Sequence, residues 1–300
     1  MDANSGLNIL FIINPGSGGK KKIQWESVIR DHCKQLSLQI EFVMLKGKND
    51  EELVRSRIKE MKPQKVAAVG GDGTISMVAS LLIGTSIPLG MLRGGSANGM
   101  ATELEIPTDS SAALNVIING KARPCDLIQF DKNRFCIHLS DLGLNARLVK
   151  YFDKSAIRGM WGYVRFLIKI LLEGKPVKAH IRVDDMEKNI PAYMIVFANA
   201  SKYGTGASIN PDGAVGDGKF ELVVVREISF VEFLKLFLKK TTFDPKKVQV
   251  IQTTKAVVTL KRKTHFQVDG EYIGKINKIT ASIVPGALLV IAPDPAKNRK

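Results

Sequence analysis

Glycine-rich loops that contain polar side chains are the strongest chemical signal in this 300-residue chain. Gly70-Gly71-Asp72-Gly73-Thr74 follows the apolar run 66–69 and precedes a segment with helical spacing. Glycine lets backbone N–H groups approach an anion closely, and a helix N-terminus adds positive potential. The pattern therefore predicts phosphate binding, with Asp72 placed to hold a metal ion or a water. The alternative is a plain turn between a strand and a helix, because short glycine motifs recur by chance.

Two more loops of this kind follow other apolar runs. Asn14-Pro15-Gly16-Ser17-Gly18-Gly19-Lys20 comes after residues 9–13, and Gly94-Gly95-Ser96-Ala97-Asn98-Gly99 comes after residues 88–92. The carboxyl ends of parallel strands share one edge of a sheet, where ligands bind. Three such loops at one edge suggest a cradle for a nucleoside triphosphate. Neither the P-loop pattern nor the dinucleotide fingerprint is present, and Lys20 either steers an anion or starts a solvated helix.

The elements that must position these loops differ between the two halves of the chain. Up to about residue 120, apolar runs alternate with helical spacing, which predicts a doubly wound parallel sheet with helices on both faces. Beyond about residue 130, β-branched runs separated by turn signals predict an antiparallel sandwich or open barrel, interrupted by helices near 159–172 and 229–240. We expect an α/β nucleotide-binding domain over 1–128 and a β-rich domain over 129–300, whose last residues could pack back on the first domain.

Composition limits the class of protein. The chain is 45% hydrophobic and 24% charged, which argues against a disordered or fibrous protein. No apolar run approaches the ~18 residues that span a bilayer, and the N-terminus has no secretory pattern. Cys33, Cys125 and Cys136 show no metal spacing, so they indicate buried apolar residues in a reducing compartment and no zinc site.

The charge points to an anionic partner. Lys and Arg number 44 against 29 Asp and Glu, which gives a net charge of +15. Nucleic acid, anionic lipid or a polyphosphate substrate would be attracted, although a basic surface without a specific partner is the alternative. Between Arg147 and Lys178, basic residues interleave with aromatic ones. This stretch would suit a helix resting on an anionic membrane; a nucleic-acid surface and a core-facing helix with a solvated basic face are the alternatives.

Together, N-P-x-S-G, G-G-D-G-T, G-S-x-N and a later V-D-G-E at 268–271 resemble the diacylglycerol kinase catalytic-domain family, which includes bacterial soluble lipid kinases and the sphingosine and ceramide kinases. The resemblance extends from Asn14 to about Pro293. It implies transfer of the γ-phosphoryl group of ATP to a lipid hydroxyl, with Mg²⁺ and with ATP in an interdomain cleft. The nucleotide-binding candidates are Asn14, Pro15, Ser17, Gly18, Lys20, Gly70, Gly71, Asp72, Gly73, Thr74, Gly95, Ser96 and Asn98.

The resemblance makes Asp269 the base for the attacking hydroxyl and places Asp72 at the catalytic centre. A carboxylate facing the γ-phosphate can accept that proton, whereas Asp-Gly between apolar residues is also a strong hairpin-turn signal. Glu271 is the third catalytic candidate: it would share a strand face with Asp269 if the strand continued regularly, which would give a pair able to hold Mg²⁺ through water.

The metal candidates also come from the resemblance. Asp126 is matched to an aspartate that joins the metal–water network of Asp72, with a plain strand residue near a turn as the alternative. A structural Mg²⁺ is matched to the Asp217 side chain and the carbonyls of Ala214 and Lys219, with two metal-free Asp-Gly turns as the alternative.

Two departures from the family pattern bear on specificity. Gly99 stands where the diacylglycerol-type enzymes have an aspartate, and Met77 stands where the family often has a carboxylate. We expect a lipid kinase acting on a diacylglycerol- or sphingosine-like acceptor, cytoplasmic and peripheral at the inner membrane face, without a nucleic-acid partner, and with a homodimer left open. The rivals are an enzyme like NAD kinase, which shares G-G-D-G-T, and a catalytically weak nucleotide- or lipid-sensing module.

Overall fold

The computed structural model describes residues 6–17, 24–34, 36–95, 98–131, 134–144, 146–147, 175–200, 215–227 and 243–294. It divides into two compact units. Unit 1 comprises Met1–Cys125 with Gly286–Lys300, and unit 2 comprises Asp126–Pro285. The chain passes from one unit to the other within β5 (Lys121–Phe130) and again within β14 (Glu271–Ala292). The helices expected near 159–172 and 229–240 lie outside the described residues.

Unit 1 is built on a parallel sheet, in the order β4-β3-β1-β2, with the end of β14 beside β4. The interior strands are fully apolar because both of their faces are covered, as residues 9–12 and 66–68 show with no exposed surface. The strands of this sheet are β1 (Asn8–Ile13), β2 (Gln39–Met44), β3 (Lys65–Gly70) and β4 (Leu89–Arg93).

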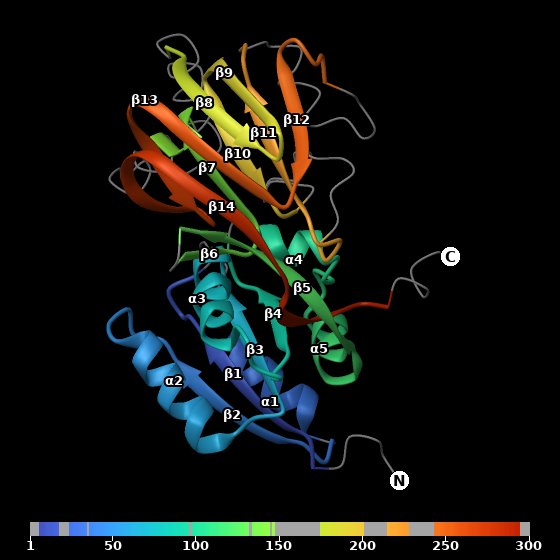
Figure 1. The fold of residues 1–300 in the computed structure, drawn as a ribbon. Helices are drawn as coiled ribbons and strands as arrows, with labels where there is room; N and C mark the ends of the chain where they lie inside the picture. The colour runs from blue at the N-terminus through green and yellow to red at the C-terminus, as the bar shows by residue number, and fades with distance from the viewer. Residues whose placement is uncertain are drawn as a thin grey trace. The chain divides into compact units, whose positions relative to one another are not determined.

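The helices of unit 1 lie on both faces of that sheet. They are α1 (Trp25–Cys33), α2 (Asp50–Met61), α3 (Asp72–Leu82), α4 (Gly99–Glu103) and α5 (Ser110–Asn119). The chain runs from β1 to β2 in one direction and then from β2 through β3 to β4 in the other. Right-handed crossovers then put α1 on the opposite face from α2 and α3. Accordingly α2 packs on α3, and α1 packs on α5 (Figure 1). The doubly wound α/β fold is confirmed.

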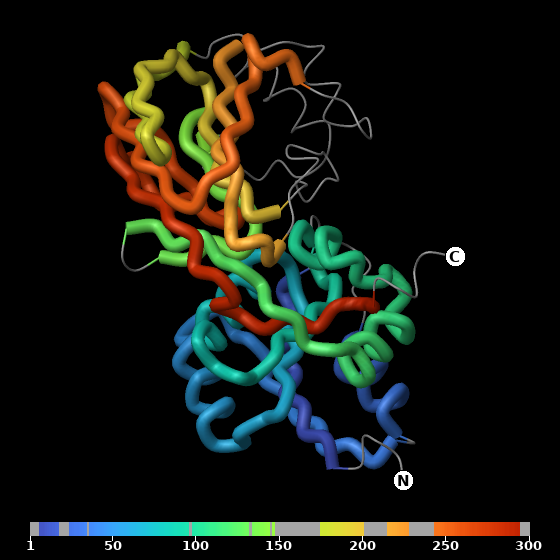
Figure 2. Tube along the Cα trace, turned by 45° about the vertical axis from the view of Figure 1, so that its right-hand side comes forward, coloured from blue at the N-terminus to red at the C-terminus, as the bar shows by residue number. Residues whose placement is uncertain are grey.

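Unit 2 is an antiparallel β-structure, as predicted. Its main sheet has the order β12-β11-β10-β7-β13-β14, and a β8–β9 hairpin pairs with β13 through β8 (Figure 2). Phe130 packs edge-to-face on Phe197 and Phe266, with ring centroids 5.1 and 5.4 Å apart, at the centre of its core. The remaining strands are β6 (Arg134–Cys136), β7 (Leu139–Gly143), β8 (Val177–Val183), β9 (Met186–Ala192), β10 (Met194–Ala198), β11 (Phe220–Val225), β12 (Val248–Thr253) and β13 (Lys255–Val268).

Within the described ranges, no helix combines the length and apolar character needed to cross a bilayer.

Candidate active site

The glycine-rich loops that follow β1 and β3 lie next to each other where the strand order of unit 1 reverses. β1 is followed in sequence by β2 on one side, whereas β3 lies on its other side, so the loops after β1 and β3 flank a topological switch point. Ligands bind at such points in open α/β sheets. The Asn14 Nδ2 donates to Thr74 Oγ1 at 3.0 Å, and its Oδ1 accepts from Gly16 N at 2.9 Å. The side chain of Asn14 therefore ties the first loop to the N-terminal turn of α3.

The third loop packs directly against the second. Gly94 N donates to Gly70 O at 2.9 Å. A Cβ atom on Gly95 would lie 2.4 Å from the Cα of Gly71, and one on Gly94 would lie 2.9 Å from the Cα of Gly70. Real Cβ atoms do not approach backbone this closely, so these glycines are required for backbone-to-backbone contact between the two loops.

Asn98 closes the third loop and starts α4. Its Oδ1 accepts from Gly95 N at 2.8 Å, and its Nδ2 donates to Gly95 O at 2.7 Å. With a φ of 52° Asn98 is left-handed, a conformation that asparagine tolerates better than most residues. The next residue, Gly99, donates its backbone N–H to Asp72 Oδ1 at 2.6 Å. Gly99, which stands where the diacylglycerol-type enzymes have an aspartate, therefore contacts Asp72 through its backbone and not through a side chain.

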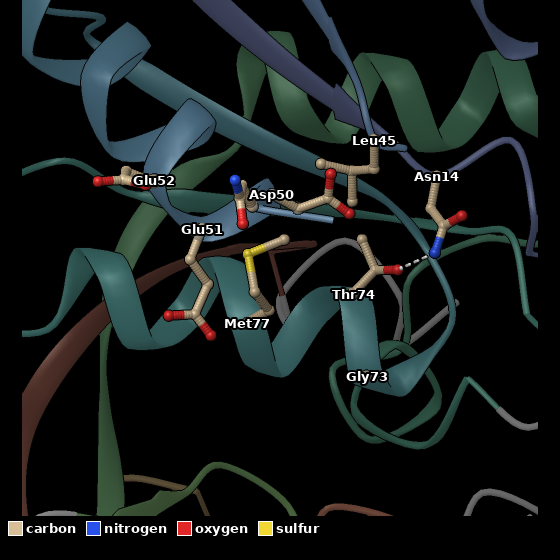
Figure 3. Close-up of a pocket in the computed structure, with 9 residues that line it drawn as sticks. Asn14, Leu45, Asp50, Glu51, Glu52, Gly73, Thr74 and Met77 are labelled. Carbon is tan, nitrogen blue, oxygen red and sulfur yellow. Dashed lines mark hydrogen bonds between the residues drawn. The ribbon is translucent and has the colours of Figure 1, made fainter. Parts of the chain in front are cut away.

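A pocket of about 510 Å³ opens beside these loops, within unit 1. Thr74 and Met77, one turn apart on α3, face the start of α2 across it (Figure 3). Its lining comprises Asn14, Leu45, Asn49, Asp50, Glu51, Glu52, Gly73, Thr74 and Met77. The Asp50 carboxylate is engaged by the backbone N–H groups of residues 46 and 47, at 2.9 and 2.8 Å. Glu51 and Glu52 are exposed and give the pocket an acidic side.

The nucleotide candidates of unit 1 therefore gather at one sheet edge, as far as the structure describes them. Ser17 turns back on the first loop, with its Oγ donating to Asn14 O at 2.7 Å. Gly73 and Thr74 line the pocket, whereas Pro15 lies in the turn after β1. Gly18, Lys20 and Ser96 lie outside the described residues, so their assignment stays a prediction.

In unit 2, Asp269 occupies the tip of the β13–β14 hairpin. Asp269 and Gly270 have φ values of 48° and 87°, and Val268 pairs with Glu271 across them. Positive φ at both central residues defines the type I′ turn, for which Asp-Gly is a preferred sequence. The hairpin turn is therefore real, and it buries the Asp269 side chain instead of exposing it; only 6% of the residue is accessible.

The Asp269 carboxylate is surrounded by donors. Its Oδ1 accepts from His138 N at 2.9 Å and from Cys136 Sγ at 3.1 Å, and its Oδ2 accepts from Ile137 N at 3.0 Å. Burial, and then the neighbouring Asp269, raise the pKa of the Cys136 thiol well above its ordinary value, so this cysteine acts as an S–H donor. All three cysteines are free and buried, as the sequence predicted.

A buried polar pair supports the turn from the other side. Gln267 Oε1 accepts from Gly270 N at 2.7 Å, and its Nε2 donates to the Asp141 carboxylate of β7. Gln267 and Asp141 are register partners and are almost wholly buried. Sequence reasoning missed Cys136, Gln267 and Asp141, because an isolated polar residue in a strand gives no signal of its partner across the sheet.

The shared strand face expected for Glu271 and Asp269 was wrong, whereas a catalytic role of Glu271 stays a prediction. The two-residue turn interrupts the strand after Val268, so Glu271 starts β14 opposite Val268 and does not share a strand face with Asp269. Glu271 is exposed, whereas Asp269 is buried, so a regular-strand carboxylate pair holding Mg²⁺ does not form.

The metal candidates of unit 2 lie around the turn before β11. The buried Asp126 accepts from Gly218 N through its Oδ2 at 2.6 Å, which anchors that turn. Asp217 Oδ1 accepts from Lys219 N at 2.9 Å, and Asp217 Oδ2 lies 3.4 Å from the Nε2 of Gln252. Within the described residues, no group of three or more His, Cys, Asp or Glu side chains is placed to hold a metal ion. Ala214 lies outside them, so the structural Mg²⁺ site stays a prediction.

Two family models match successive parts of this chain. The family model of the diacylglycerol kinase catalytic domain matches residues 8–130, and that of the YegS C-terminal NAD kinase beta sandwich-like domain matches residues 140–292. The chain belongs to the family of proteins that join a diacylglycerol kinase catalytic domain to a YegS-type C-terminal domain. Family membership indicates a kinase, and it accounts for the α/β unit being followed by a β-rich one.

Individual relatives agree with this assignment. A "Probable lipid kinase YegS-like" of Cronobacter sakazakii is 27% identical, over 93% of this chain and 94% of that protein. The diacylglycerol kinase of Bacillus subtilis is 27% identical, over 70% of this chain and 72% of its own length. A solved diacylglycerol kinase structure from Bacillus anthracis has the same fold, with a TM-score of 0.72 at 14% identity, covering 96% of this chain and 97% of that one.

Proposed function

We propose that this protein uses ATP and Mg²⁺ to phosphorylate the hydroxyl group of a lipid of the diacylglycerol or sphingosine type. The observation that carries the proposal is the joining of three glycine-rich loops at the switch point of unit 1. Asn14, Thr74 and Asp72 hold these loops together beside the pocket. Backbone N–H groups and a helix N-terminus at one place suit a polyphosphate.

The residues that line the pocket suggest where the triphosphate and the base of the nucleotide would lie. The triphosphate would lie against the first turn of α3, near Thr74 and Asn14, and the base would lie against Met77 and Leu45. In this proposal Glu51 and Glu52, which line the pocket, would accept from the exocyclic amine of adenine. Met77 replaces a carboxylate that the family often has at this position. Two other carboxylates, those of Glu51 and Glu52 at the start of α2, line the same pocket.

Asp72 is the residue we propose for Mg²⁺. Mg²⁺ is commonly held by one or two carboxylates together with substrate phosphates and waters, so a single aspartate in a phosphate cradle fits it. The ion would neutralise charge on the transferred phosphoryl group. Asp72 keeps its orientation through the Gly99 N–H bond, which leaves its second oxygen, Oδ2, for that role in the proposal.

Asp269 is the base that we propose. In the transfer step the acceptor O–H bond breaks, its proton passes to the Asp269 carboxylate, an O–P bond forms, and the bond between the γ-phosphorus and ADP breaks. The surrounding donors, Cys136 Sγ and the N–H groups of residues 137 and 138, all require an acceptor at Asp269. These contacts hold the carboxylate in one orientation, as a positioned general base requires.

The acceptor also dictates where the protein must work. A lipid substrate lies in a bilayer, and a net charge of +15 attracts anionic membrane surfaces. We therefore propose peripheral association with the cytoplasmic face of the inner membrane. The stretch between Arg147 and Lys178, which the sequence favours for this contact, lies mostly outside the described residues.

A transfer assay tests the function directly. Radiolabelled ATP with Mg²⁺ is offered with diacylglycerol, sphingosine, ceramide and a total lipid extract in anionic micelles. We expect one lipid to acquire label. If ATP binds but no lipid is labelled, the lipid-kinase proposal fails. NAD is then offered as the soluble acceptor, which separates an NAD-kinase-like enzyme from a sensing module.

The acidic side of the pocket gives a second prediction. Replacing both Glu51 and Glu52 with Gln should lower the ATP-to-GTP affinity ratio by about 3- to 10-fold, because hydrogen bonds to charged groups contribute roughly 1.5 kcal/mol or more. Titration of each nucleotide measures the ratio. The loss of charge affects both triphosphates equally, so the ratio isolates the base. Asp31→Asn on α1, outside the pocket lining, is the control. An unchanged ratio in the double variant would place the base elsewhere.

A further inference from the structure

Strand β13 changes its pairing partner along its length in unit 2. Its first part, up to Leu260, pairs with β8, whereas Phe266 to Val268 pair with β7. On the other side, its register with β14 shifts between Thr259, opposite Lys278, and Thr264, opposite Ile276. Residues 260–263 therefore stand opposite the single residue Asn277. Strands that change partners at the corners of β-structures commonly do so through bulges of this kind.

The bulge carries three consecutive basic residues, and other basic residues surround it. Arg262 reaches back to the start of the β8 segment, where its Nη2 lies 3.5 Å from Lys175 O. Lys178 precedes Ala179, the register partner of Leu260. We call the whole set the corner cluster: Lys175, Lys178, Lys261, Arg262, Lys263, Lys275 and Lys278, all of them exposed.

The corner cluster is a concentration of unopposed positive charge. In the part of the chain that the structure describes, none of its seven members forms an ion pair with a carboxylate. Two acidic residues beside these strands have partners of their own: Glu187 on β9 pairs with His180 at 2.8 Å, and Asp131, after β5, accepts from Thr280 N at 3.2 Å. The seven positive charges of the corner cluster equal about half of the net charge of the whole chain, which is +15.

We infer that the corner cluster is the surface by which this protein docks on an anionic lipid bilayer. The inference rests on the proposed function, because a lipid acceptor brings the protein to a membrane. Attraction to anionic lipid adds up over each basic residue held near the surface, so seven exposed basic residues on and beside neighbouring strands, three of them in the bulge, suit this partner.

Vesicle binding tests the inference without any need for catalysis. The protein is mixed with phosphatidylcholine vesicles, or with vesicles that also contain phosphatidylglycerol, and the bound fraction is measured by sedimentation. The triple variant Lys261→Gln, Arg262→Gln, Lys263→Gln should lose about 100-fold in partitioning to the anionic vesicles. Neither protein should bind phosphatidylcholine alone, and added salt should weaken wild-type binding.

A matched control removes the same charge from unit 1. Arg55, Lys59 and Lys62, at α2 and its C-terminal end, are exposed, and their replacement by Gln should change partitioning by less than about 3-fold, because they lie outside the cluster. Equal losses in the two triple variants would overturn the inference, since net charge alone would explain binding. Unchanged binding of the cluster variant would also overturn it. Tighter, cluster-dependent binding of a single-stranded oligonucleotide than of vesicles would replace the membrane with nucleic acid.

A failure of the proposed kinase function can be distinguished from a failure of the docking inference. Phosphoryl transfer to a short-chain diacylglycerol, dispersed as monomers, does not require a bilayer. The cluster variant should keep wild-type turnover on this acceptor while losing vesicle binding. If the wild type itself transfers no phosphate, the kinase proposal fails; partitioning of the two triple variants still decides the docking surface.

Discussion

Replacing Asp269 with Asn should lower turnover in lipid phosphorylation by about 10²- to 10⁴-fold, because the amide cannot take up the hydroxyl proton. ATP affinity should stay within a factor of about 3, since the pocket that we propose for the nucleotide lies in unit 1. The side-chain amide would direct its own N–H groups either at Ile137 N or at the donors that contact Oδ1 in the wild type. Because two donors would then face each other, the free energy of unfolding should fall by about 1–3 kcal/mol. Turnover, ATP titration and thermal unfolding measure the three effects.

The β8–β9 hairpin offers a matched control for this variant. Asp184 has the same residue type at the same position of a two-residue turn, with a φ of 49°, but it is exposed. Asp184→Asn should leave turnover and ATP affinity unchanged. Retention of more than a tenth of wild-type turnover by folded Asp269→Asn would show that another group accepts the proton, and Asp72 would be examined next.

The two halves of the fold were predictable to different degrees. Fully apolar runs such as residues 9–13 and 66–69 predict buried parallel strands, because both of their faces are covered. Strand β7 gave no such signal. Its sequence Leu-Ser-Asp-Leu-Gly looks like a turn, yet Ser140 and Asp141 are wholly buried. They are stabilised by partners on β13: Ser140 Oγ donates to Gln267 O at 2.6 Å, and Gln267 donates to Asp141. Such partners appear only when the chain is folded.

The candidate site shows the same limit. Spacing alone placed the three loops at one edge, because the carboxyl ends of parallel strands must meet there. Spacing could not reveal why particular glycines are needed. The resemblance made Gly95 a nucleotide-binding candidate, and the structure adds that the Cα of Gly71 lies 2.4 Å from where a Cβ atom on Gly95 would be. For Asp269, the sequence leaves a hairpin turn and a catalytic base as alternatives, whereas in the structure a type I′ turn and a buried carboxylate occur together at this residue.

Replacing Gly95 with Ala should disrupt the nucleotide cradle. The new Cβ would lie 2.4 Å from the Cα of Gly71 and 3.2 Å from Asn98 Oδ1, so the second and third loops would have to separate. The paired hydrogen bonds between Gly95 and Asn98 and the bond from Gly94 N to Gly70 O would weaken together. We expect ATP affinity to fall by at least about 10-fold, since overpacking typically costs about 1–3 kcal/mol.

Two other glycines separate binding from stability. Gly90→Ala puts a Cβ 2.8 Å from Ile117 in the core, so it should lower the melting temperature but leave ATP affinity of the folded protein unchanged. Gly71→Ala meets the Cα of Gly95 at 3.3 Å, so the loops need give only a few tenths of an ångström, and its loss of stability should be smaller than that of Gly95→Ala. Calorimetric titration and thermal unfolding measure both quantities. If Gly95→Ala binds ATP as the wild type does, the joined second and third loops are not the phosphate cradle, and the nucleotide must be held by other residues.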